Sequence, residues 1–253
     1  MKNITIRLML LAMLVTVAKY SAAKSAPQDS MSSMSAADLE KAGDQARAKK
    51  DYTLAVRYLQ AASKKDRKNA DLYNKLGLAE LQNDDLRSAR TDFEKASKRN
   101  PKFAEAINNI GAVDYKRKNY SSAAKYFKKA VALDETRATY HVNLGAAWFS
   151  QKNLDGAVAE YTRAMELDPE AFHQQARVGV VAQIASPEER AQYAYLLAKI
   201  YAQRGDTENC LQCLRKAKED GYRNLANVYK DQAFSSLRDN PQLHEVVPPP
   251  VAK

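Results

Sequence analysis

A repeat of 34 residues constrains this chain more than any other feature of its sequence. Four columns of similar residues recur at that interval, and no insertion interrupts the spacing. The columns are Gly43, Gly77, Gly111 and Gly145; Ala55, Ala89, Ala123 and Ala157; Leu59, Phe93, Phe127 and Tyr161; and Ala62, Ala96, Ala130 and Ala164. A fixed period of this size is typical of chains built from stacked supersecondary units, each of which contacts only its neighbours.

Each unit has the pattern of two antiparallel helices. In residues 70–103, apolar and small side chains recur at helical spacing on both sides of a polar turn at 83–85, and Asn100-Pro101 ends the second helix. The small columns allow two helices to approach closely, and the large column fills the space beside them. Only eight Gly and eight Pro occur in the chain, which also favours helices. The predicted fold class is all-α.

The units resemble tetratricopeptide repeats. The residues that carry the resemblance are Ile107, Ile110, Gly111, Ala123, Phe127 and Ala130, with the repeat-ending Pro101 and Pro169. Four units match, at 36–69, 70–103, 104–137 and 138–171. Ala42 stands where the family favours leucine, and Glu135 replaces the terminal proline of the third unit. The resemblance implies an α-solenoid of stacked antiparallel helix pairs, which binds a protein or peptide and is not an enzyme.

The register after residue 171 has two interpretations. The first four columns continue through Gly179, Ala191, Tyr195 and Ala198. The preferred interpretation places a fifth repeat at 191–224, because Gly205-Asp206 is a clear turn. Residues 172–190 are then an extra helix and turn, and Ser186-Pro187 supplies the N-cap and first residue of the next helix.

The C-terminal part of the chain resembles the segment that closes bacterial tetratricopeptide arrays. The matching residues are Asp231, Phe234, Leu237, Arg238 and Pro241. The resemblance implies that 225–246 is a helical cap over the last apolar face of the solenoid. Three prolines at 248–250 then predict a disordered, Pro-rich tail over 247–253.

The N-terminus has the pattern of a secretory signal peptide. Lys2 and Arg7 precede an apolar run at 8–18, which is too short to cross a membrane, and Ser21-Ala22-Ala23 fits a cleavage site. We expect residues 1–23 to be removed and the mature protein to be periplasmic or secreted; an uncleaved anchor is the alternative. The Ser-rich stretch at 24–35 predicts a flexible linker.

The sequence contains no pattern typical of a catalytic, metal or cofactor site. His141, His173 and His244 are the only histidines, and none has the spacing of a metal-binding pair. Cys210 and Cys213 form a C-x-x-C pair, but Cys210 falls in a small, buried column, so we expect a packing role. A disulfide between them and a thiol-redox function are the alternatives.

The family's groove-facing columns predict the lining of a partner site. Carried over to this chain, they are Asn74, Leu78, Leu81, Asn108, Ala112, Tyr115, Val142, Ala146 and Phe149. Apolar side chains and asparagine amides suit a peptide with apolar anchors, although Tyr115 and Phe149 could instead pack between helices. The family's carboxylate clamp is rejected, because its positions in repeats one to three hold Glu40, Asp44, Lys75, Glu105 and Asn109.

The excess positive charge lies in the first three repeats. Residues 36–137 carry 23 basic and 15 acidic residues, whereas residues 138–253 carry 13 and 14. An exported protein rarely meets nucleic acid, and no aromatic residues interleave the basic runs, so no nucleic-acid partner is expected. Two interpretations of the basic half stay open. The charges can simply solubilise the edge of the solenoid and lie near helix C-termini, or they can attract an acidic protein or an anionic envelope surface as a further partner. The sequence does not indicate an oligomeric state.

Overall fold

The computed structural model describes residues 31–169, 171 and 186–250, and these residues are helical, without strands. They fall into two compact units, residues 1–100 and 101–253. The predicted signal peptide, the first part of the linker and the extra helix at 172–185 lie outside the described residues. No described helix is long and apolar enough to cross a membrane.

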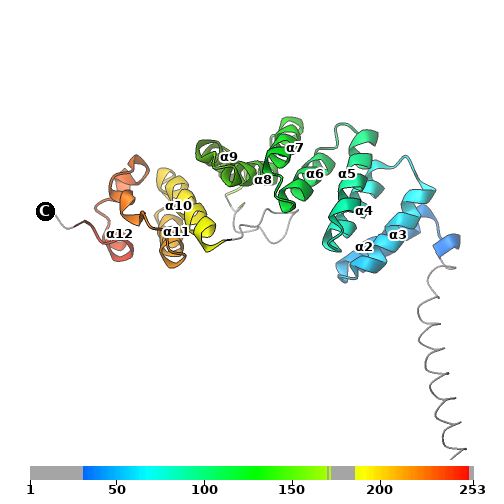
Figure 1. Cartoon of the computed structure of the whole chain (residues 1–253), viewed down its shortest axis with the longest axis horizontal. Coiled ribbons are helices and arrows are strands. Elements are labelled where there is room, and N and C mark those ends of the chain that lie inside the picture. The colour runs from blue at the N-terminus through cyan, green and yellow to red at the C-terminus, as the bar shows by residue number, and fades with distance from the viewer. Residues whose placement is uncertain (1–30, 170, 172–185, 251–253) are drawn as a thin grey trace, which may run out of the picture. The chain divides into compact units, whose positions relative to one another are not determined.

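The first unit holds two antiparallel helix pairs. Its helices are α2 (Ala36–Ala48), α3 (Tyr52–Lys65), α4 (Ala70–Gln82) and α5 (Leu86–Arg99). Figure 1 shows α2 beside α3 and α4 beside α5, and α3 of the first pair packs against α4 of the second. These pairs correspond to the first two predicted repeats.

The second unit holds three such pairs and the closing segment. The paired helices are α6 (Ala104–Lys116), α7 (Tyr120–Leu133), α8 (Ala138–Ser150), α9 (Leu154–Leu167), α10 (Pro187–Gln203) and α11 (Thr207–Glu219). The closing segment comprises η1 (Leu225–Tyr229), η2 (Gln232–Leu237) and α12 (Pro241–Val246). The predicted all-α fold of stacked helix pairs is confirmed.

The turn inside each pair has the same backbone conformation. The residue before the N-cap of the second helix has a positive φ, of 62° at Lys50, 65° at Asp84, 62° at Lys118, 64° at Lys152 and 74° at Gly205. The first four of these residues are 34 positions apart. Only glycine adopts this region without steric cost, so the fifth pair has the least strained turn.

The glycine column exists because two helices of one pair approach closely there. A Cβ atom added to Gly77 would lie 2.7 Å from the Phe93 ring, and one added to Gly111 would lie 2.7 Å from the Phe127 ring. The large residue of the second helix therefore occupies the space that a side chain on the first helix would need. The glycine column and the large-residue column of the sequence are therefore the two sides of one contact.

The N-terminal linker is shorter than the sequence predicted. Residues 31–33 form a helical turn, and Met31 is buried against Leu39, Ala62 and Leu72. Lys65 Nζ also donates hydrogen bonds to the carbonyl oxygens of Ser32, at 2.8 Å, and Met34, at 2.5 Å. Met31 is therefore part of the core of the first helix pair, and the prediction of a flexible linker is wrong for 31–35.

The closing segment covers the end of the second unit. Phe234, Leu237, Leu243 and Val246 are buried in one cluster with residues of α10 and α11. Val247 is also buried, and its carbonyl oxygen accepts a hydrogen bond from the Tyr229 hydroxyl at 2.5 Å. Val247 therefore belongs to this cap, and the predicted tail begins one residue too early.

Candidate functional site

The nine residues predicted to line a groove lie on the first helices of repeats two to four. Asn74, Leu78 and Leu81 are on α4; Asn108, Ala112 and Tyr115 are on α6; and Val142, Ala146 and Phe149 are on α8. Eight of these side chains are buried, and Leu78 is half-buried. The α4 residues belong to the first unit and the other six to the second. Their role as a groove lining stays a prediction.

Two hydrogen bonds join α6 and α8 within the second unit. Asn143 Nδ2 donates to Asn108 Oδ1 at 2.9 Å, and the hydroxyl oxygens of Tyr115 and Ser150 are 2.8 Å apart. Burial raises the pKa of Tyr115, so its hydroxyl stays protonated at neutral pH. These contacts fix the register of the two first helices.

Phe149 connects α8 to the next helix pair. Its ring meets the Tyr193 ring of α10 edge to face, with centroids 5.7 Å apart, and the Tyr161 ring meets Tyr193 in the same way at 5.5 Å. Aromatic pairs in this geometry stabilise packing beyond the area they bury. Truncation of Tyr115 or Phe149 would therefore remove packing contacts, whatever else these side chains do.

Lys75 cannot serve a carboxylate clamp. Its Nζ atom lies 2.5 Å from Glu40 Oε1, 2.9 Å from Asp44 Oδ2 and 3.6 Å from Asp71 Oδ2. Burial alone would lower the pKa of Lys75, but its hydrogen bonds to Glu40 and Asp44 raise that pKa above its usual value. Three carboxylates already surround the ammonium group, which agrees with the rejection of a clamp.

The two cysteines lie one turn apart on α11 as free thiols. Cys210 is fully buried in the core that α10 and α11 share with the closing segment, and Cys213 is half-buried. Burial raises the pKa of Cys210 to about 12 and that of Cys213 to about 11, and the nearby Asp206 charge adds to both shifts. The thiolate form is disfavoured in both, which is the opposite of a redox-active pair.

His141 of α8 is buried and contacts both α9 and the end of the third repeat. Its Nδ1 atom is 2.6 Å from Glu160 Oε2, and its Nε2 atom is 3.0 Å from the carbonyl oxygen of Glu135. Both ring nitrogens therefore have polar partners within the fold. Among the residues the structure describes, no group of three or more His, Cys, Asp or Glu side chains could hold a metal ion.

Two buried carboxyl groups meet between α4 and α5. Glu80 is 3% exposed and Asp92 is 5% exposed, and Lys95 Nζ lies 2.5 Å from Asp92 Oδ1. Burial, and then the charge and hydrogen bond of Asp92, raise the pKa of Glu80 to about 8. At neutral pH this arrangement holds a proton on Glu80. The sequence pattern did not predict it.

Six exposed basic residues of the first unit lie at or just after the C-terminal ends of α3 and α5. This basic edge consists of the exposed residues Lys64, Lys65, Arg67, Lys68, Lys98 and Arg99. Arg99 Nε donates to the carbonyl oxygen of Arg67 at 2.6 Å, and the Arg99 guanidinium lies 4.0 Å from the centroid of the Tyr73 ring. These contacts bring the two basic segments together.

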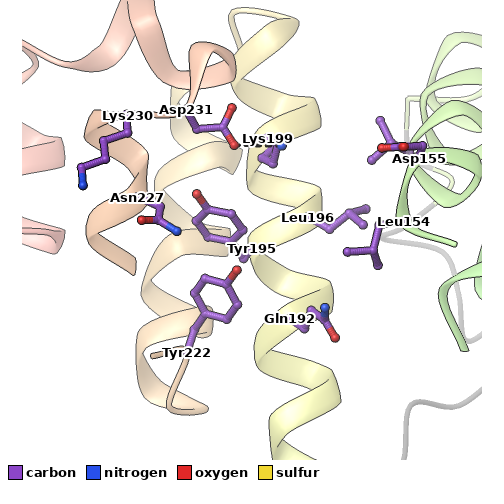
Figure 2. Close-up of a pocket in the computed structure, with 11 residues that line it drawn as sticks. Leu154, Asp155, Gln192, Tyr195, Leu196, Lys199, Tyr222, Asn227, Lys230 and Asp231 are labelled. Carbon is purple, nitrogen blue, oxygen red and sulfur yellow. Dashed lines mark ion pairs between the residues drawn. The ribbon is translucent and has the colours of Figure 1, made fainter. Parts of the chain in front are cut away.

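A cavity of about 540 Å³ lies in the second unit, between α9, α10 and the segment that follows α11 (Figure 2). Its lining residues are Leu154, Asp155, Val158, Gln192, Tyr195, Leu196, Lys199, Tyr222, Asn227, Lys230 and Asp231. The sequence did not predict this site. The repeat columns identify residues that contact each other within one helix pair, whereas the cavity lies between a pair, its neighbour and the closing segment. Four of these residues, at 192, 195, 196 and 199, form one face of α10, and that spacing was the only signal available.

Comparisons with known proteins agree with this architecture. Family models described as tetratricopeptide repeat match residues 40–101, 75–138, 113–172 and 191–219. The solved structure of MamA from Desulfovibrio magneticus RS-1 has a TM-score of 0.53 at 21% identity, over 73% of this chain and 93% of that one. TTC0263, a thermophilic tetratricopeptide repeat protein of Thermus thermophilus, has a TM-score of 0.51 at 18% identity, over 76% and 94%.

A search of curated proteins found no match. The similar solved structures are less than 25% identical to this chain, so they support the fold alone. The family models, however, cover more than half of the chain, and the matched residues include parts of all five helix pairs. The chain belongs to the tetratricopeptide repeat family, whose members serve as protein–protein interaction scaffolds.

Proposed function

We propose that this protein is an exported, non-enzymatic scaffold that holds a segment of a partner protein along the first helices of its repeats. The observation that carries this proposal is the hydrogen-bonded register between α6 and α8, made by Asn143 with Asn108 and by Tyr115 with Ser150. These bonds make neighbouring first helices a rigid platform, and a preorganised surface loses less entropy when a partner binds.

Leu78 of α4 offers the sharpest test of the predicted first-helix lining, because it is the one predicted lining residue that is not buried. Affinity capture from envelope extract would use the mature chain and its Leu78→Glu variant. Leu133→Glu, at the exposed end of α7, is the matched control. We expect partners of the mature chain to be lost with Leu78→Glu and retained with Leu133→Glu. Equal retention by all three proteins would overturn binding at the first-helix position of Leu78.

Export is a separate part of the proposal and rests on the sequence of residues 1–23. We expect the mature protein to begin at Lys24 and to appear outside the cytoplasm of a Gram-negative host. Intact-mass measurement after cell fractionation would check both points. A full-length mass in the cytoplasmic fraction would contradict export, and a full-length mass in the membrane fraction would favour an uncleaved anchor.

A second candidate function is attachment to an anionic envelope surface through the basic edge. The contact of Arg99 with Arg67 favours it, because it holds two basic segments together against their mutual repulsion. Binding to vesicles with anionic lipids should then weaken steeply between low and physiological salt. The Lys64→Gln, Lys68→Gln, Lys98→Gln variant should lose that binding, whereas unchanged binding would exclude the edge.

The thiol-redox alternative has the least support. An attacking thiol needs a substantial thiolate fraction near neutral pH, and burial raises the pKa of Cys210 to about 12 and that of Cys213 to about 11. A disulfide-exchange assay with wild type and the Cys210→Ser, Cys213→Ser double variant would check this directly. Exchange by the wild type alone would revive the alternative.

A further inference from the structure

Tyr195, which lines the cavity beside α10, carries a buried hydroxyl without a hydrogen-bond partner among the described residues. The Tyr195 side chain is 7% exposed. Burial, and then the charge of Asp231, raise the pKa of Tyr195, so the hydroxyl carries its proton at neutral pH. A buried polar group in this state is costly unless another molecule supplies an acceptor.

The charged residues of the cavity cancel one another. Lys199 Nζ lies 2.8 Å from Asp231 Oδ2, and Figure 2 shows this ion pair beside Tyr195. Asp155 and Lys230 are the other two charged lining residues, and their charges are opposite. A phosphate or a carboxylate would meet no net positive charge in this lining. The cavity therefore favours an uncharged occupant.

The walls of the cavity are apolar on two sides. The rings of Tyr195 and Tyr222 stack with centroids 4.4 Å apart, and the Phe234 ring lies 5.6 Å from Tyr195 and supports it. Across the opening, Leu196 of α10 points toward Leu154 of α9 (Figure 2). Leu154 is 36% exposed, and among the described residues only it and Leu133 are large apolar side chains exposed to this extent.

Two amide side chains complete the lining. Gln192 and Asn227 each offer a donor and an acceptor, the same groups that a peptide bond presents. We propose that this cavity binds an uncharged segment of a partner protein, with one apolar side chain between Leu154 and Leu196 and a main-chain carbonyl oxygen accepting from the Tyr195 hydroxyl. The volume of about 540 Å³ suits a short segment of this kind.

This inference rests on the proposed scaffold function but uses a surface separate from the first-helix residues of α4, α6 and α8. The probe is a library of random linear heptapeptides displayed on phage and selected on the mature chain. Selected peptides would be synthesised with capped ends, and their dissociation constants would be measured by titration calorimetry. We expect them to share an apolar residue within an uncharged stretch.

Three variants locate the binding. Tyr195→Phe keeps the ring and removes the donor, so it should weaken the selected peptides about fivefold while leaving the melting temperature equal or higher. Leu154→Glu places a charge at the rim and should weaken them at least about tenfold. Leu133→Glu, at the similarly exposed leucine outside the cavity, should leave the dissociation constants unchanged.

Several results would overturn the proposal. These are a selection that yields no binding peptide, a consensus of acidic or basic peptides, and equal binding by Leu154→Glu and Leu133→Glu. A fall in melting temperature with Tyr195→Phe would show that the hydroxyl has a structural partner, which also contradicts the proposal. If cavity variants keep every partner that Leu78→Glu loses, the scaffold function stands and this inference fails.

Discussion

The buried pair of Glu80 and Asp92 predicts an unusual dependence of stability on pH. The pKa of Glu80 is raised from 4.5 to about 8 in the folded chain, so between those values the folded state binds a proton that the unfolded state has released. The free energy of unfolding must then fall as pH rises through this window, with a limiting slope of about 1.4 kcal/mol per pH unit. Below about pH 4.5 and above about pH 8, Glu80 contributes no slope.

The expected size of the effect follows from the surroundings of the pair. Lys95 pairs with Asp92 rather than with Glu80, while Asp85 adds a further negative charge beside Glu80. Because two coupled carboxyl groups share the shift and their surroundings can relax, we expect about 2 kcal/mol to be lost between pH 5 and pH 9. That is a large share of the stability of a small helical unit.

Glu80→Gln tests this reasoning, because glutamine keeps the shape and the donor of the protonated acid at every pH. Urea unfolding followed by circular dichroism at 222 nm would be measured from pH 5 to pH 9. The variant should match wild type at pH 5 and exceed it by about 2 kcal/mol at pH 9. Glu219→Gln, at an exposed position on α11, is the control and should follow wild type throughout. Parallel curves for wild type and Glu80→Gln would refute the shared proton.

Three further predictions concern packing, turns and thiols. Gly111→Ala should destabilise the chain by about 1–3 kcal/mol in urea unfolding, because its Cβ would lie 2.7 Å from the Phe127 ring; no loss would mean that the helix pair can separate freely. Lys118→Gly should raise stability by about 0.5–1 kcal/mol, since it relieves a φ of 62°, and a lower melting temperature would contradict this. Iodoacetamide should modify Cys213 about 100-fold more slowly at pH 8 than a thiol with a pKa near 9, because its pKa is about 11; mass spectrometry that finds rapid labelling would argue against burial.

Much of the fold could be predicted from the sequence because contacts within a repeat are local. The glycine and large-residue columns lie 16 positions apart, as in Gly77 and Phe93, so one pattern specifies both partners of the contact. Ser186 also caps α10 as predicted, with its side chain accepting from the backbone N–H of Glu189 at 3.1 Å. Capping depends on a few neighbouring residues and on no distant partner.

The candidate sites depended on contacts that the repeat pattern does not contain. The sequence placed Tyr115 and Phe149 on the first helices of their repeats. Their contacts with Ser150 and Tyr193 depend on how successive pairs stack, which the repeat pattern does not contain. Met31 carried no repeat signal either, because it lies before the first 34-residue unit and packs against Leu39, Ala62 and Leu72.

The sequence by itself determined the helix pairs, their turns and their family, since each of these follows from residues within one 34-residue period. Only the tertiary structure decided which side chains remain open to a partner. Tyr195, Tyr222 and Asp231 are distant in sequence and meet because the closing segment folds back on α10. The burial and the charge of these side chains depend on contacts between separate elements, and a single sequence period carries no information about such contacts.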